Sequence, residues 1–140
     1  MKSARISNNK EKGNLKKLRI LLIDDEEIML DTMYEILMLE NKFEVDRSPD
    51  ARDAIQKIKN DEYQLIISDL RMPGISGYDL FNWIINNKPQ MACKVLFTSG
   101  DPFDPRSKRF FEEIPNLCLV KPFGISEFMD YIHRSLGAME

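Results

Sequence analysis

Hydrophobic and polar positions form two kinds of stretch that alternate along the chain. Short runs such as 20–23, 65–67 and 95–97 are apolar throughout, as expected for strands that are buried on both faces. Longer stretches place apolar residues three and four positions apart, which is typical of amphipathic helices. The pattern predicts five strand and helix pairs: Leu18–Ile23 with Glu26–Glu40, Phe43–Val45 with Asp50–Asn60, Leu65–Ser68 with Tyr78–Asn87, Lys94–Phe97 with Pro105–Glu113, and Leu117–Val120 with Ser126–Leu136.

This alternation predicts an α/β fold, a doubly wound five-stranded parallel sheet with five helices. Parallel neighbours need a crossover connection, which is usually a helix, and helices then cover both faces of the sheet. Ligands of such folds bind beyond the carboxyl ends of the strands. We expect the first and last helices to face the sheet through two apolar stripes, Ile28, Met29, Thr32, Ile36 and Leu39 in the first and Ile125, Phe128, Met129, Ile132 and Leu136 in the last.

The length of 140 residues fits one domain, which we place at residues 18–138, after a flexible basic segment at 1–17. The net charge is −3, but residues 1–19 hold seven basic side chains and one acid, which leaves −9 for the rest. A basic arm can bind nucleic acid or another acidic partner, and it can also be a solvated tail. The segment has no aromatic residues and no periodicity, so we favour the tail and expect no direct binding of nucleic acid.

The two cysteines, Cys93 and Cys118, lie in apolar runs and are expected to be reduced, buried thiols. The sequence contains no run of eighteen apolar residues and no secretory signal pattern. These features favour a cytoplasmic protein without membrane contact.

Polar residues follow four of the predicted strands: Asp24 and Asp25, Asp69, Thr98, and Lys121. Carboxylates gathered at one edge repel one another unless a cation neutralises them, and Mg²⁺ prefers oxygen ligands. A carboxylate such as Asp69 can act as the nucleophile in phosphoryl transfer. Magnesium, the Lys121 ammonium and the Thr98 hydroxyl are then candidates to contact the oxygens of the transferred group.

These residues resemble the receiver domains of two-component response regulators. The resemblance rests on Asp24-Asp25, the segment DLRMPGISG at 69–77, Thr98-Ser99 and the Lys-Pro-Phe sequence at 121–123, and it covers roughly residues 18–138. It implies a flavodoxin-like fold with strand order 2-1-3-4-5. It also implies a cis bond between Lys121 and Pro122.

The resemblance further implies a phosphoacceptor domain that is not an enzyme in the ordinary sense. A histidine kinase or a phosphotransfer protein would donate the phosphoryl group. The domain would then bind a downstream protein, or a second copy of itself, through the face of its fourth helix, fifth strand and fifth helix. By the resemblance, Asp69 is the phosphoacceptor, Thr98 the switch hydroxyl and Lys121 the phosphate-binding lysine, while the Mg²⁺ ligands are Asp24, Asp25, Asp69 and the backbone carbonyl of Arg71.

One position departs from the family pattern. Receivers usually carry Tyr or Phe three residues before the lysine, and the rotation of that ring accompanies the switch hydroxyl, but this chain has Cys118 there. Either another group such as Phe103 or Phe123 responds to phosphorylation, or the conformational change is smaller.

Other functions remain open from the sequence. A magnesium-dependent phosphohydrolase would also use an aspartyl phosphate, but it needs a second acid soon after the nucleophile, and the first acid after Asp69 is Asp79. A scaffold that takes no phosphate is a third alternative. The sequence also leaves open whether the chain is a stand-alone receiver or a fragment of a larger regulator or hybrid kinase.

Overall fold

Five parallel strands form the central sheet of the computed structural model, which describes residues 17–137. Their order is β2-β1-β3-β4-β5, which confirms the predicted topology. The strands are β1 Leu18–Ile23, β2 Phe43–Ser48, β3 Leu65–Asp69, β4 Val95–Ser99 and β5 Cys118–Val120.

Among the described residues, five α-helices and one short 3₁₀-helix connect the strands. The α-helices are α2 Glu27–Leu37, α3 Ala51–Asn60, α4 Gly77–Asn87, α5 Pro105–Glu112 and α6 Ile125–Gly137, and the 3₁₀-helix is η1 Pro89–Lys94. The predicted helix over Glu26–Glu40 is therefore shorter, and η1 was not predicted. None of these helices is long and apolar enough to cross a membrane.

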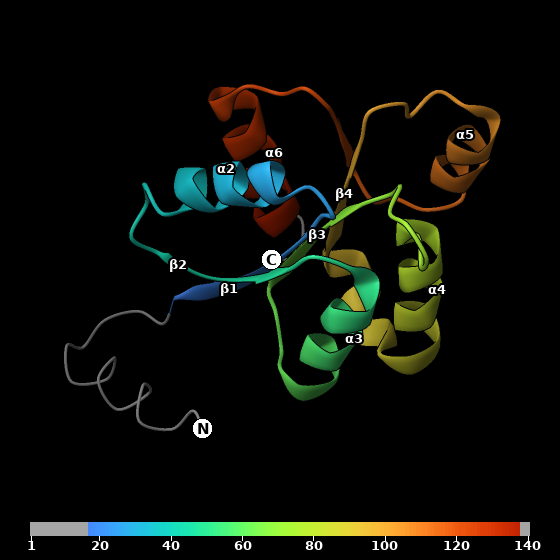
Figure 1. Ribbon diagram of the computed structural model, residues 1–140, viewed down its shortest axis with the longest axis horizontal. Coiled ribbons are helices and arrows are strands. Elements are labelled where there is room, and N and C mark those ends of the chain that lie inside the picture. Colours follow the sequence, from blue (N-terminus) through green and yellow to red (C-terminus); the bar gives the residue numbers. More distant parts are fainter. Residues whose placement is uncertain (1–16, 138–140) are drawn as a thin grey trace.

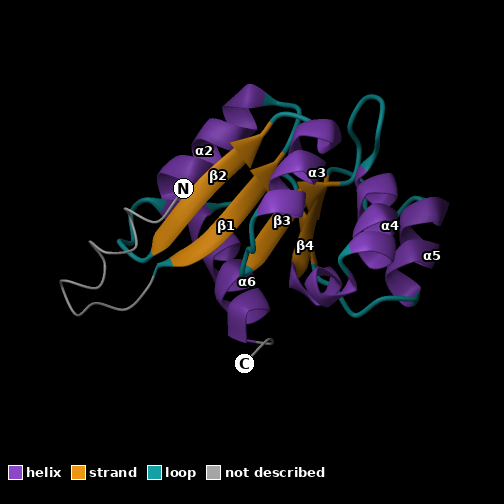
Figure 2. Cartoon of the chain, turned by 90° about the horizontal axis from the view of Figure 1, so that it is seen from below, coloured by secondary structure: helices purple, strands orange, loops and turns teal. Residues whose placement is uncertain are grey.

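The helices cover the sheet on both faces, α2 and α6 on one and α3, α4 and α5 on the other (Figures 1 and 2). Side chains of β1 alternate between the two layers, as the pleat of a strand requires. Ile20 and Leu22 pack with α2 and α6, whereas Leu21 and Ile23 pack with α3 and α4. Each apolar strand thus contributes to two separate cores.

The buried face of α2 differs from the predicted stripe. Ile28 and Leu39 are 81% and 74% exposed, while Leu30 and Met33 are buried. Apolar residues occupy more than one side of this segment, so the spacing of three and four fits two rotations of the helix. The helix also ends at Leu37, before Leu39. In α6 the central residues of the stripe, Phe128 and Ile132, are buried as predicted, and Ile125 at its start is exposed.

The prediction of two buried cysteines is wrong for Cys93, which is exposed in η1. Pro89 begins a 3₁₀ turn there, so the strand starts only at Val95. Cys118 does lie in β5, where it is half-buried. The predicted basic segment at 1–17 lies outside the described residues, except for Lys17.

Candidate functional site

The predicted site residues come together at the carboxyl edge of the sheet. Asp24 follows β1, Asp69 ends β3, Thr98 lies near the end of β4, and Lys121 follows β5. Parallel strands all end at the same edge, and the register places Asp69 beside Thr98 on the neighbouring strand. Residues far apart in the sequence therefore lie together at one edge of the sheet.

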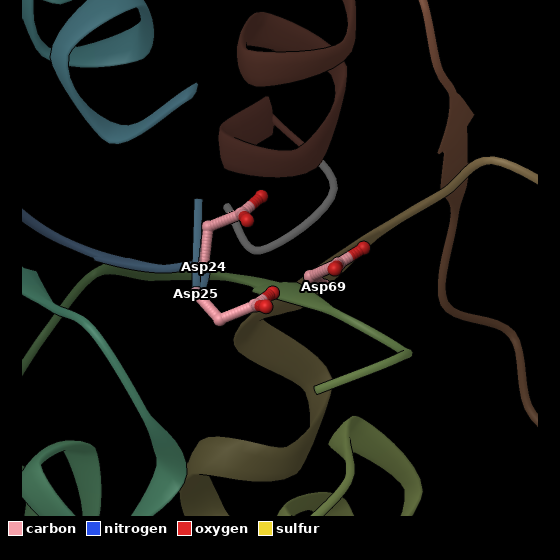
Figure 3. A group of neighbouring side chains, drawn as sticks. All are labelled: Asp24, Asp25 and Asp69. Carbon is pink, nitrogen blue, oxygen red and sulfur yellow. The ribbon is translucent and has the colours of Figure 1, made fainter. Parts of the chain in front are cut away.

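Three carboxylates form an acidic cluster at this edge. One oxygen from each of Asp24, Asp25 and Asp69 lies within 4.8 Å of the others, and the side chains stand side by side in Figure 3. Asp24 and Asp69 are buried and Asp25 is exposed, so one side of the cluster is open to solvent. Hard oxygen ligands at this spacing, with an open side for water, fit a Mg²⁺ ion.

The Lys121 ammonium is the cation nearest to the cluster. Its Nζ lies 2.9 Å from Asp24 Oδ2 and 3.4 Å from Asp69 Oδ1. Burial lowers the pKa of Lys121, but the hydrogen bond to Asp24 and the charges of Asp69 and Asp24 outweigh burial and raise the pKa overall. The lysine therefore stays protonated. Glu26 Oε1, 3.5 Å from Nζ, is a further partner.

The pKa of Asp69 is raised to about 6. Burial is the main cause, the charge of Lys121 opposes it, and the charges of Asp24 and Asp25 add to it. The Thr98 hydroxyl, 3.4 Å from Asp69 Oδ1, donates a long hydrogen bond to this carboxylate. Asp69 is thus a buried carboxylate with a cation and a hydroxyl at the same oxygen.

Asp24 also fixes the start of α2. Its Oδ1 accepts a hydrogen bond from the Glu26 amide at 2.9 Å, while Oδ2 pairs with Lys121. Glu26 is the N-cap residue of α2, and its side chain makes no capping hydrogen bond. Glu26 was not among the residues predicted for the site, although it contacts Lys121.

The loop after Asp69 is held close to the start of α4 by Gly77. A Cβ at Gly77 would lie 2.2 Å from the Asp69 carbonyl oxygen, so no other residue fits without a shift of the backbone. The Gly77 amide donates to the Leu70 carbonyl at 2.9 Å. Within the loop, Gly74 has a φ of +79°. Two glycines therefore shape the segment that carries Arg71.

Arg71 directs its side chain to α5, where Nη2 lies 2.8 Å from Asp104 Oδ2. Its backbone carbonyl as a metal ligand stays a prediction. The bond between Lys121 and Pro122 is cis, as the resemblance implied.

A doubly wound sheet whose carboxyl edge joins an acidic cluster, a lysine and a hydroxyl defines a signalling domain of the response-regulator type. Residues 20–133 match the response regulator receiver domain family, and the chain belongs to that family. These residues form a receiver domain of the two-component response-regulator type, and such domains are not enzymes in the usual sense.

Curated relatives are regulatory proteins of bacteria. Regulatory protein VanRB of Enterococcus faecalis is 29% identical over 106 residues, which cover 76% of this chain and 46% of that protein. Transcriptional regulatory protein HprR of Escherichia coli is 29% identical over 119 residues, covering 85% and 52%. The chain thus spans about half the length of these relatives.

Solved structures show the same fold. The non-phosphorylated HemR receiver domain from Leptospira biflexa superposes with a TM-score of 0.74 at 27% identity, over 86% of this chain and 94% of that one. A CheY-like receiver domain protein from Methanospirillum hungatei JF-1 gives 0.78 at 23% identity, over 88% and 96%. At that lower identity the likeness concerns the fold alone.

Proposed function

We propose that the protein accepts a phosphoryl group on Asp69 from a histidine kinase or phosphotransfer protein, and that this changes its affinity for a partner. The observation that carries the proposal is the position of Asp69: Lys121 and Thr98 both lie near one of its oxygens, and Asp24 and Asp25 are close by. The whole set lies at the open edge of the sheet, where a donor can approach.

In the proposed step, an Asp69 carboxylate oxygen attacks the phosphorus atom of the donor. The new oxygen–phosphorus bond forms as the bond to the leaving group breaks, and the leaving group departs with that electron pair. Lys121 remains protonated and contacts one equatorial oxygen, while the Thr98 hydroxyl donates to another. These residues act by position and charge rather than as a general base.

Asp24, Asp25, Asp69 and the Arg71 backbone carbonyl would bind the Mg²⁺ ion. The ion would offset the negative charge of the cluster and of the incoming phosphoryl group. The donor set fits this role, because the three carboxylates converge within 4.8 Å and Asp25 leaves the cluster open.

The geometry around Asp79 disfavours the phosphohydrolase alternative. Asp79 Oδ2 accepts hydrogen bonds from the Ser76 amide at 3.2 Å and the Ser76 hydroxyl at 3.0 Å, as part of the cap of α4. The first acid after Asp69 is therefore engaged at a helix end and does not serve as a general acid for rapid turnover.

Intact-mass measurement with acetyl phosphate and Mg²⁺ tests the proposal. We expect the wild type to gain one phosphoryl group and Asp69→Asn to gain none, whereas Asp130→Asn, which alters an exposed carboxylate of α6, should behave like the wild type. Equal labelling of Asp69→Asn would refute the assignment. Rapid release of phosphate from many monoesters would favour the hydrolase.

The face of α5, β5 and α6 is the proposed partner surface. Phe103, just before α5, is 77% exposed, and Val120 at the end of β5 is 38% exposed, so apolar side chains are available there. A downstream protein or a second copy of the chain would cover them after phosphorylation. Light scattering with and without acetyl phosphate distinguishes self-association from binding to another protein.

A further inference from the structure

Helix α5 is attached to the rest of the domain at two points of different character. Its second half is held by aromatic packing, in which the Phe110 ring contacts the rings of Tyr78 and Phe97 at centroid distances of 4.9 and 5.3 Å. Its first half has no large buried side chain, because Ser107 is the only buried residue of α5. Polar contacts therefore decide where the start of this helix lies.

Those contacts centre on the Asp104 carboxylate at the N-cap of α5. Oδ1 accepts a hydrogen bond from the Ser107 amide at 3.0 Å, and Oδ2 accepts from the Ser107 hydroxyl and from Arg71 Nη2, each at 2.8 Å. The Ser107 hydroxyl also bonds to the Tyr78 hydroxyl at 2.6 Å. This group, which we call the Asp104 network, consists of Arg71, Tyr78, Asp104 and Ser107.

The Asp104 network connects the loop at 70–76 to the start of α5 across an open cleft, and the Arg106 guanidinium, 3.9 Å from the centre of the Tyr78 ring, adds a contact between α4 and α5. A cavity of about 540 Å³ lies between the loop at 70–76 and the start of α5, and Arg71, Tyr78 and Asp104 line it. The Ser107 amide and hydroxyl and the Arg71 guanidinium lower the pKa of Asp104 to about 2, so this carboxylate is ionised at neutral pH. The charged pair with Arg71 thus bridges an open space rather than reinforcing a packed contact.

One end of the bridge lies directly beside the phosphoacceptor. Arg71 follows Asp69 by two residues, and the carbonyl of the intervening Leu70 is bonded to Gly77, so this backbone has little freedom to move independently of Asp69. A change in the position of this backbone is therefore passed to the Arg71 side chain and from there to Asp104.

Receivers usually carry a Tyr or Phe ring at the position of Cys118, and this ring is missing here. Phe103 and Phe123, the two residues that could respond to phosphorylation in its place, are poorly positioned to do so. The Phe123 ring is stacked on Phe128 at 5.3 Å, within the core of the opposite face. Phe103 is 77% exposed and has no ring contact among residues 17–137. Cys118 has no ring whose rotation could signal the state of Thr98.

We propose that Arg71 and Asp104 are positioning residues that couple occupancy of the Asp69 site to the start of α5. The inference rests on the proposed function of Asp69. Neither side chain touches the phosphoryl group; each acts through the Asp104 network. The start of α5 takes one position when the Asp69 site is empty and another when it is occupied. The ion pair of Arg71 and Asp104 couples the occupancy of the site to the position of the helix start.

Hydrogen exchange of the amides at 105–112, with and without Mg²⁺ and beryllofluoride, tests the coupling. Asp104→Asn keeps a good N-cap for the Ser107 amide but removes the charge that binds Arg71. Arg71→Ala removes the guanidinium and keeps the backbone carbonyl. We expect beryllofluoride to change exchange at the start of α5 in the wild type, and we expect each variant to reduce this change at least about fivefold.

Arg47→Ala is the matched control, since it removes an exposed ion pair of 2.6 Å with Asp31 on the far side of the sheet from α5. It should leave the α5 response at the wild-type level. A full response in Arg71→Ala or in Asp104→Asn overturns the inference, and so does a wild-type protein that binds beryllofluoride without any change in α5. Fluorine NMR reports binding separately: a wild type that binds none refutes the proposed function itself.

Discussion

The position of the Asp69 carboxylate lowers the stability of the folded protein when this group is ionised. The side chain is buried beside two other carboxylates, which raises its pKa to about 6 even though Lys121 acts in the opposite direction. An ionised carboxylate in this position is less stable than the same group in the unfolded chain. Burial, with a smaller contribution from the charges of Asp24 and Asp25, therefore makes the ionised form of Asp69 unfavourable in the folded state.

The Asp69→Asn variant should be more stable than the wild type at pH 7 without magnesium, by about 3 kcal/mol. The folded pKa of about 6 exceeds the ordinary value of 3.8, so the folded state retains a proton that the unfolded state has lost as the pH rises between these values. The wild type therefore loses stability across this interval, and Asp69→Asn does not. Urea unfolding should show the full difference at pH 7 and little at about pH 4. A wild type as stable as the variant at pH 7 would contradict this assignment.

Gly77→Ala should disturb both the fold and the site. The new methyl group would lie 2.2 Å from the Asp69 carbonyl oxygen, so the phosphoacceptor loop must move away from α4. We expect a loss of about 1–3 kcal/mol in unfolding free energy and slower labelling by acetyl phosphate. Gly124→Ala is the control, because nothing lies within 4 Å of a Cβ there. Equal effects of the two substitutions would show that the close approach is unimportant.

At the scale of single elements, the sequence predicted the fully buried strands better than the helix faces, whereas β2, which is only partly buried, extends to Ser48 beyond the predicted Phe43–Val45. A strand buried on both sides is apolar at every position, so its location is clear from the sequence whichever way the side chains point. A surface helix buries only one of its faces. Because α2 has apolar residues on more than one side, the spacing did not identify the buried face, and Ile28 was wrongly placed in the core. The 3₁₀ turn that exposes Cys93 was also missed, because Met91, Ala92 and Cys93 precede the apolar run of β4 closely enough to be taken for part of it.

A pair of substitutions in α2 tests the observed face. Met33 is fully buried, so Met33→Ala should lower the unfolding free energy by about 2–5 kcal/mol. Ile28 is 81% exposed, so Ile28→Ala should change it by less than about 0.5 kcal/mol. Thermal unfolding of both variants gives the comparison. A larger loss of unfolding free energy for Ile28→Ala than for Met33→Ala would show that the helix face expected from the sequence is the buried one.

The site was more predictable than the helix faces because it depends on strand ends. Asp24, Asp69 and Lys121 each follow an apolar run, and parallel strands bring their carboxyl ends together whatever the packing of the helices. The contacts of Glu26 and Asp104 were not predictable in this way. They depend on how far a side chain reaches from a helix start, which the spacing of residues does not encode.

For the whole molecule, magnesium should act as a stabilising ligand if the acidic cluster binds it. A ligand present at 100 times its dissociation constant stabilises the folded state by about 2.7 kcal/mol. We expect saturating Mg²⁺ to raise the midpoint of thermal unfolding of the wild type and EDTA to reverse the shift. Asp25→Asn, which removes one carboxylate of the cluster, should show a smaller shift. An identical response in Asp25→Asn would exclude this carboxylate as a ligand.

The hydrogen bond between Lys121 and Asp24 joins residues 97 positions apart. Lys121 directly follows β5, the last and shortest strand, at the border of the sheet, whereas Asp69 ends β3 at the centre of the sheet. A chain in which β5 has not yet paired with β4 would already place Asp69 at the end of β3. It would not yet have the Lys121 ammonium beside this carboxylate. If Asp69 accepts the phosphoryl group as we propose, an incompletely folded copy would lack the lysine that contacts the acceptor oxygen.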